Sequence, residues 1–132
     1  MTENKNYKSG MVFGVFDGLH EGHKYFLNIA KKQCDKLIVV VVQDEVVEII
    51  KNRTPKNNLE NRIEEIKLFA PDLVVIPGDK ASGGWQVLKE NNPDIIFLGY
   101  DQEVIARELD KLNTPYIFID SHFPEKYKSS LL

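Results

Sequence analysis

Short apolar runs alternate with amphipathic segments along the whole chain. Residues 37–42 consist only of leucine, isoleucine and valine, a pattern typical of a central parallel strand that is buried on both faces. The other apolar runs are shorter and rich in strand-forming residues. We predict strands at Met11–Phe16, Leu37–Gln43, Leu73–Ile76, Ile95–Leu98 and Tyr116–Ile119.

The segments between these runs carry helical signals. Apolar side chains recur at the spacing of one helix face between Phe26 and Ala30, which predicts a first helix directly after the first strand. Asp44 can cap a second, short helix. The later helices are predicted at Asp44–Ile50, Leu59–Phe69, Trp85–Glu90 and Glu103–Leu112.

The alternation of strand and helix predicts an α/β fold. Right-handed crossovers would assemble a five-stranded parallel sheet with helices on both faces. Ligands of such sheets bind at the carboxyl edge of the strands, where the winding direction reverses. We therefore expect the ligand-binding and catalytic residues in the loops that follow the strands.

Composition restricts the remaining possibilities. A chain of 132 residues with 42% hydrophobic content forms one domain, which we place at residues 11–132 after a polar lead-in at residues 1–10. The sequence contains no apolar run long enough to cross a bilayer, and its one cysteine, Cys34, suits a reducing cytoplasm. The formal charge of −3 argues against general binding to nucleic acid or to a membrane surface.

The segment Gly14–His23, Gly-Val-Phe-Asp-Gly-Leu-His-Glu-Gly-His, has the strongest chemical character. It lies where the first strand feeds the first helix, and the free N–H groups of a helix N-terminus attract phosphate. His20 and His23 are three residues apart and share one helix face, with Gly22 leaving space between them. We expect both imidazoles to donate to a bound phosphate chain.

A zinc site is the main alternative for the two histidines. His-x-x-His can present two nitrogens to a metal, but zinc needs three or four ligands, and Cys34 lies at the far end of the same predicted helix. We therefore assign no metal ligands in the protein. His122 is interpreted as an ordinary surface or core histidine, and its place near the C-terminal basic segment leaves a minor role at the site as the alternative.

The string Gly-x-Phe-Asp-Gly-x-His-x-Gly-His resembles the signature of the cytidylyltransferase-like nucleotidyltransferase superfamily, and the resemblance extends over Met11–Leu131. It implies a Rossmann-like fold and transfer of a nucleoside monophosphate from a nucleoside triphosphate to a phosphate-bearing acceptor. By this resemblance His20 and His23 are catalytic, Asp17 and Gly18 face the acceptor, and the nucleotide is bound by Gly14, Val15, Phe16 and Gly22.

A basic loop follows the second predicted strand and helix. Lys51-Asn-Arg-Thr-Pro-Lys followed by Glu60-Asn-Arg62 resembles the superfamily pattern in which such a loop precedes a helix with Glu-x-Arg. The resemblance implies that Lys51 and Arg62 contact phosphate, with Arg53 near the acceptor. The alternative for Arg62 is a surface pair with Glu65, three residues further along the helix.

Two later elements also resemble the superfamily. Gly99-Tyr-Asp-Gln102 is similar to a turn near the base and ribose, which implies nucleotide contacts from Gly99 and Asp101 and an acceptor contact from Tyr100. Asp101 could equally cap the following helix. Ser129 and Ser130 resemble an element that binds the β and γ phosphates, and the alternative is an untethered terminus.

The resemblance favours short archaeal FAD synthases, with ATP as donor and FMN as acceptor, although the chain lacks their C-terminal cysteines. A CTP-dependent cytidylyltransferase acting on glycerol-3-phosphate or a related phosphoalcohol is the second hypothesis. A noncatalytic nucleotide-binding module is the third. Mg²⁺ would arrive with the triphosphate, and the resemblance implies a homodimer.

Overall fold

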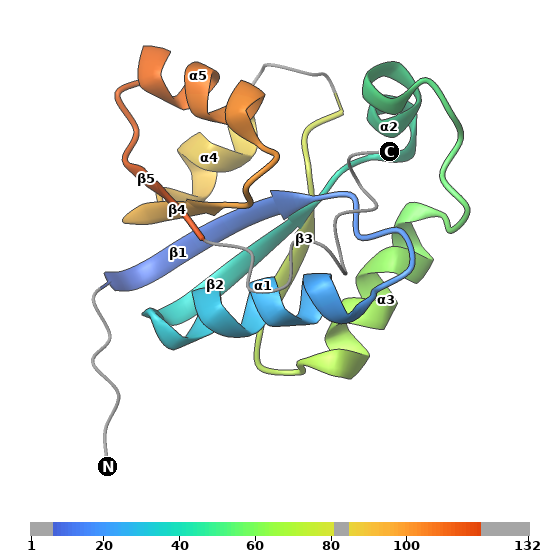
Figure 1. The fold of residues 1–132 in the computed structure, drawn as a ribbon, viewed down its shortest axis with the longest axis horizontal. Helices are drawn as coiled ribbons and strands as arrows, with labels where there is room; N and C mark the ends of the chain where they lie inside the picture. Colours follow the sequence, from blue (N-terminus) through green and yellow to red (C-terminus); the bar gives the residue numbers. More distant parts are fainter. Residues whose placement is uncertain (1–6, 81–84, 120–132) are drawn as a thin grey trace.

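The computed structural model describes residues 7–80 and 85–119. In this part of the chain strands and helices alternate (Figure 1). The strands are β1 (Tyr7–Gly14), β2 (Cys34–Val41), β3 (Val74–Pro77), β4 (Ile95–Leu98) and β5 (Tyr116–Phe118). The helices are α1 (Glu21–Lys32), α2 (Asp44–Lys51), α3 (Leu59–Phe69), α4 (Gln86–Asn91) and α5 (Glu103–Lys111).

The five strands form one parallel sheet in the order β3-β2-β1-β4-β5, which confirms the predicted fold class. The chain moves outward from β1 to β3, and then returns to the other side of β1 with β4 and β5. The winding direction therefore reverses between β1 and β4. Their carboxyl ends lie at the position where ligands bind in open parallel sheets.

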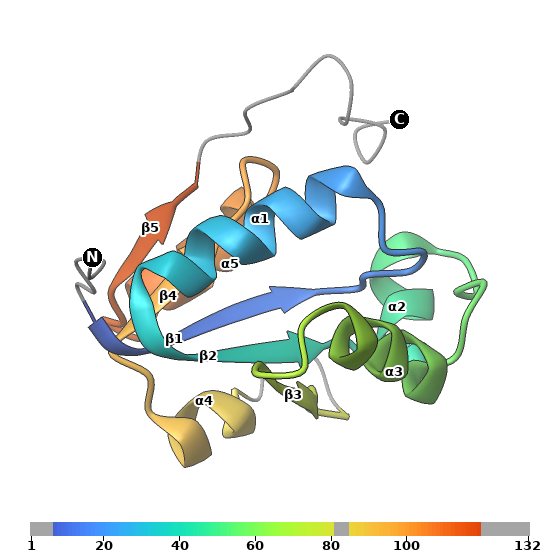
Figure 2. The same cartoon turned by 90° about the horizontal axis from the view of Figure 1, so that it is seen from below.

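Alternation along the strands divides the core into two layers. On β1, Val12 contributes to one layer, and Met11 and Phe13 contribute to the other. The first layer is covered by α1 and α3 through Leu27, Ile66 and other apolar residues. The second is covered by α4 and α5, so helices lie on both faces of the sheet. Figure 1 has α4 and α5 on one side of the strands and α1 and α3 on the other, and Figure 2 is seen from the side of α1 and α3. Period-two alternation in buried strands produces this division.

Most predicted element boundaries are confirmed to within two residues. The bounds of α3 and β4 coincide with the predicted ranges. The largest error is at β1, which was predicted to begin at Met11 but begins at Tyr7 and ends at Gly14. Residues 7–10, assigned to the lead-in, therefore belong to the sheet, where Tyr7 pairs with Cys34 and Gly10 with Leu37.

The second strand also begins earlier than predicted, at Cys34 and not at Leu37. Asp44 is the first residue of α2 and not its cap, because Gln43 occupies the N-cap position. Within the described residues, none of the helices combines the length and apolar character that a membrane span needs.

Candidate functional site

The candidate site lies where β1, β2 and β4 end. Two glutamines link neighbouring strand ends: Gln102 links the end of β1 to that of β4, and Gln43 links the end of β2 to that of β3. Gln102 donates from Nε2 to the carbonyl of Phe13 at 2.9 Å, and its Oε1 accepts from the backbone of Gly99 at 2.8 Å. Gln43 donates to the carbonyl of Gly78 at 3.0 Å. Neither glutamine is among the site residues predicted from the sequence, although each is the N-cap residue of the helix that follows its strand.

The two histidines form the start of α1. His20 is the N-cap residue, and its Nδ1 accepts from the backbone N–H groups of Gly22 and His23 at 3.1 and 3.3 Å. In return, Nδ1 of His23 accepts from the backbone N–H of His20 at 3.4 Å. The two side chains thus complete a reciprocal capping box, a role usually filled by Ser or Thr with Glu or Gln.

This capping arrangement selects one tautomer of each imidazole. A nitrogen that accepts a hydrogen bond from an amide cannot itself carry the proton in a neutral ring. Both Nδ1 atoms are acceptors, so each neutral ring carries its proton on Nε2. The rings stack with centroids 3.7 Å apart and planes 18° from parallel.

The protonation state of His23 is set by its surroundings. Burial, together with the nearby His20, lowers the pKa of His23 from 6.5 to about 4, against opposing effects of Asp101 and a hydrogen bond at the Gly18 backbone. His23 is therefore neutral at physiological pH. It can act as a hydrogen-bond donor and not as a permanent cation.

The turn before the histidines has an unusual backbone. Phe16 has a φ of 53° and Gly18 a φ of 81°, both in the region that disfavours residues with a side chain. The buried ring of Phe16 contacts His23 edge to face, with centroids 5.3 Å apart. A Cβ on Gly14 would lie 2.6 Å from that ring, so Gly14 leaves room for Phe16. The turn thus places the buried ring of Phe16 against the imidazole of His23.

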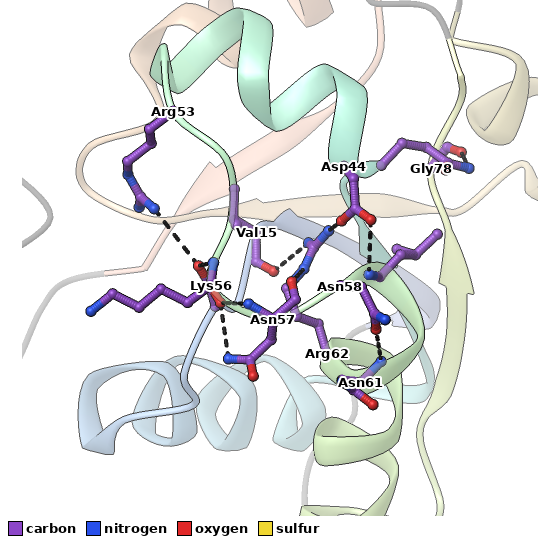
Figure 3. Close-up of polar contacts among 12 residues, drawn as sticks. Val15, Asp44, Arg53, Lys56, Asn57, Asn58, Asn61, Arg62 and Gly78 are labelled. Atoms are coloured by element: carbon purple, nitrogen blue, oxygen red, sulfur yellow. Dashed lines mark hydrogen bonds and ion pairs between the residues drawn. The ribbon is translucent and has the colours of Figure 1, made fainter.

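The structure directs Asp17, predicted to face the acceptor, toward the protein instead. Its carboxylate accepts from the backbone N–H groups of Lys56 at 2.7 Å and Asn57 at 2.9 Å, and from the Asn57 side chain at 3.0 Å. Arg53 approaches the same carboxylate at 3.7 Å (Figure 3). Burial works to raise the pKa of Asp17, but the hydrogen bonds from Lys56 and Asn57 and the charge of Arg62 together hold it below 3.8.

Arg62, predicted to contact phosphate, is fully buried. Its guanidinium donates to the carbonyl of Asn57 at 2.9 Å, to the carbonyl of Val15 at 2.9 Å and to the carboxylate of Asp44 at 2.5 Å (Figure 3). In this arrangement it is not presented to a ligand. The alternative of a surface pair with Glu65 is wrong, because Arg62 lies inside the protein.

The other predicted cations remain accessible. Lys51 is exposed in the last turn of α2, and the Arg53 side chain is 52% exposed in the loop between α2 and α3. Lys56 is exposed in the same loop, and its side chain extends away from Arg62 (Figure 3). These three side chains are exposed to solvent, whereas Arg62 is not.

The turn after β4 lies beside the histidines. Asp101 is exposed and close enough to His23 to affect its pKa. Tyr100 is 36% exposed, and the side chain of Phe26 from α1 lies 4.0 Å from the position of a Cβ on Gly99. Asp101 does not cap α5, whose N-cap residue is Gln102. The fold thus brings the motif of residues 14–23 together with the turn of residues 99–102.

Ser129, Ser130 and His122 lie outside the described residues. Among the residues that the structure describes, no group of three or more His, Cys, Asp or Glu side chains could hold a metal ion.

Comparison with known proteins identifies the family of the chain. The family model described as cytidylyltransferase-like matches residues 11–130. The FAD synthase of Thermococcus sibiricus is 37% identical over 99% of this chain and 89% of its own length, and that of Pyrococcus abyssi is 41% identical over 75% and 67%. A crystal structure of the lipopolysaccharide core biosynthesis protein from Thermoplasma volcanium superposes with a TM-score of 0.73 at 29% identity, covering 87% of this chain and 96% of that one. The chain therefore belongs to the cytidylyltransferase-like family of nucleotidyltransferases.

Proposed function

We propose that the chain is an FMN adenylyltransferase, an FAD synthase that joins AMP from ATP to FMN and releases pyrophosphate. The observation that carries the proposal is the pair of stacked histidines capping α1 at the carboxyl edge of β1. The FAD synthase relatives, which are similar over most of the chain, support the choice of substrates.

The reaction is a direct displacement. An oxygen of the FMN phosphate attacks the α-phosphorus of ATP, a new P–O bond forms, and the bond to the β-phosphate oxygen breaks. The leaving pyrophosphate takes the electron pair of that bond. Since negative charge accumulates on the phosphates, the protein contributes chiefly by positioning them and stabilising their charge.

The N-terminus of α1 suits this task. The capping box occupies the backbone N–H groups of His20, Gly22 and His23, so the donors proposed for phosphate are the Nε2–H groups of the two imidazoles. In the proposal, His20 and His23 bind the transferring and leaving phosphates, and Gly14, Val15, Phe16 and Gly22 form the nucleotide side of the site. The exposed Lys51 and Arg53 would neutralise charge on the triphosphate and the FMN phosphate.

The acceptor is proposed to lie between Gly18 and the turn after β4. Tyr100 and Asp101 are exposed there, which would allow Tyr100 to contact the flavin ring of the acceptor and Asp101 the ribose of the nucleotide, ATP. Ser129 and Ser130 keep their proposed role at the β and γ phosphates by resemblance. A divalent cation, which we propose is Mg²⁺, would enter with ATP and neutralise its phosphates.

The homodimer and the cytoplasmic location expected from the sequence stay predictions.

The test is pyrophosphate release by the purified protein with Mg²⁺, with ATP or CTP crossed against FMN or glycerol-3-phosphate. The proposal predicts release with ATP and FMN only. Release with CTP and the phosphoalcohol would establish a cytidylyltransferase instead. Nucleotide binding with no release from any pair would favour a noncatalytic module.

A further inference from the structure

Asp17 and Arg62, two residues near the histidines, use their polar groups in hydrogen bonds within the protein. Asp17 lies three positions before His20, and its side chain is only 6% exposed. Its carboxylate accepts from three N–H groups of Lys56 and Asn57. These residues belong to the interhelical loop, residues 52–58, which connects α2 to α3. Asp17 thus joins the histidine turn to a loop about 40 residues further along the chain.

Arg62 binds the same part of the loop from the other side of Asn57, through its carbonyl. From α3 it donates to the carbonyl of Asn57 in the interhelical loop and to the carbonyl of Val15 in the histidine turn. Its third partner, Asp44, begins α2, and the other oxygen of Asp44 accepts from the backbone N–H of Leu59 at 3.4 Å. Three chain segments therefore meet at one buried guanidinium.

A planar guanidinium suits this position because its donors diverge in fixed directions and can bind several acceptors at once. Moving Arg62 to a ligand would break all three bonds and leave the Asp44 carboxylate with the Leu59 N–H but without the charged group that it binds here. The carboxylate of Asp17 is also fully used within the protein, since it must stay ionised to accept from the N–H groups of Lys56 and Asn57. Neither side chain has a polar group directed to a substrate in this arrangement.

We propose that Asp17 and Arg62 are positioning residues, which hold the interhelical loop, with its exposed cations Arg53 and Lys56, against the turn that carries His20 and His23. The inference rests on the proposed function in so far as the loop cations serve phosphate binding. It gives Asp17 and Arg62 a different role from substrate contact. Their effect on catalysis passes through the backbone of the loop.

The test uses Asp17→Asn in the full chain, with Asp35→Asn as the matched control. Asp35 is an exposed carboxylate near the start of β2, at the opposite edge of the sheet from the site. Asparagine has nearly the shape of aspartate, but its amide nitrogen cannot accept a hydrogen bond. Residue-resolved amide hydrogen exchange and ATP affinity by calorimetry are measured for both variants and for the unmodified protein.

Positioning predicts at least about tenfold faster exchange at the Lys56 and Asn57 amides in Asp17→Asn and about tenfold weaker ATP binding. Asp35→Asn should change neither. Weaker ATP binding with unchanged exchange would overturn the proposal, because Asp17 would then act on the ligand directly. Faster exchange with unchanged ATP binding would overturn it too, because the loop position would not matter.

Arg62→Lys supplies a second measurement, since a single ammonium keeps the charge but cannot reach three divergent acceptors. It should show the same joint change in loop exchange and ATP affinity. Normal ATP affinity in Arg62→Lys, with the loop released, would contradict the positioning role. Amide exchange and ATP binding can both be measured without FMN. A protein that binds ATP but forms no FAD would therefore contradict the proposed function only. The positioning role of Asp17 and Arg62 would still be decided by amide exchange and ATP affinity.

Discussion

Single residues near the site combine structural and chemical roles, and His20 shows this most clearly. Its Nδ1 caps α1, while its Nε2 carries the proton proposed to reach phosphate. A sequence motif indicates that such a histidine is important, but it does not separate these two contributions. Suitable substitutions can separate them.

His20→Asn and His20→Ala should differ in stability but not in activity. Asparagine is a good N-cap residue, so His20→Asn should keep the stability of the protein, whereas His20→Ala should lose about 1 kcal/mol. Both variants lose the Nε2–H donor and should lose turnover by roughly 100-fold or more. Thermal unfolding and kcat for FAD formation check this. An active His20→Asn variant would show that His20 serves only as a cap.

Protonation of His23 should make the protein less stable in weak acid. The pKa of His23 is about 4 in the folded state and 6.5, the ordinary histidine value, in the unfolded chain, so the unfolded chain binds the extra proton first as the pH falls. The contribution is complete above pH 6.5 and is lost as the pH falls towards 4, by about 2 kcal/mol between pH 7 and 5. Urea unfolding at these two pH values measures it. In His23→Gln the loss should be smaller by that amount; an unchanged loss would contradict the assigned pKa.

Helices and strands are predicted correctly where neighbouring residues in the sequence determine them, and less well where contacts with distant residues do. The ranges of α3 and β4 follow from helical periodicity and from an uninterrupted apolar run, and both were predicted correctly. The early start of β1 was missed because Lys8, Ser9 and Gly10 do not resemble strand residues. Pairing with β2 places them in the sheet, and pairing is a tertiary property.

The candidate site likewise has a part that can be predicted from adjacent residues and a part that cannot. The histidine turn was predicted because strand, turn and helix are adjacent in sequence. The contacts of Arg62 with Val15, 47 residues away, and of Asp17 with Asn57, 40 residues away, depend on how α3 packs on the sheet. No local pattern indicates that an arginine on an amphipathic helix is buried.

The junction of β1 with β4 depends on the absence of a side chain at Gly10. A Cβ there would lie 2.5 Å from Cε2 of Phe97 and 3.1 Å from Sγ of Cys34. Gly10→Ala should therefore destabilise the fold by about 1–3 kcal/mol through overpacking. Denaturant unfolding measures this loss. In the Phe97→Leu background the same substitution should cost less, and fully additive losses would contradict the packing explanation.

For the whole molecule, nucleotide binding should increase stability. A ligand that binds only the folded state stabilises it by about 2.7 kcal/mol at 100 times its Kd, which for a chain of 132 residues corresponds to about 10 °C in Tm. ATP with Mg²⁺ should produce this shift in a thermal melt, and CTP at the same concentration should produce less. A larger shift with CTP would reverse the proposed choice of donor.

The fold, the histidine pair and the FAD synthase relatives lead to one central claim, that the chain adenylylates FMN. The most direct test incubates the protein with FMN, Mg²⁺ and ATP labelled at the α-phosphorus, and follows the label by chromatography. The account predicts labelled FAD in equal amount to the pyrophosphate released, and almost none from His20→Asn. Pyrophosphate release without labelled FAD, or labelled product only when CTP and a phosphoalcohol replace ATP and FMN, would contradict it.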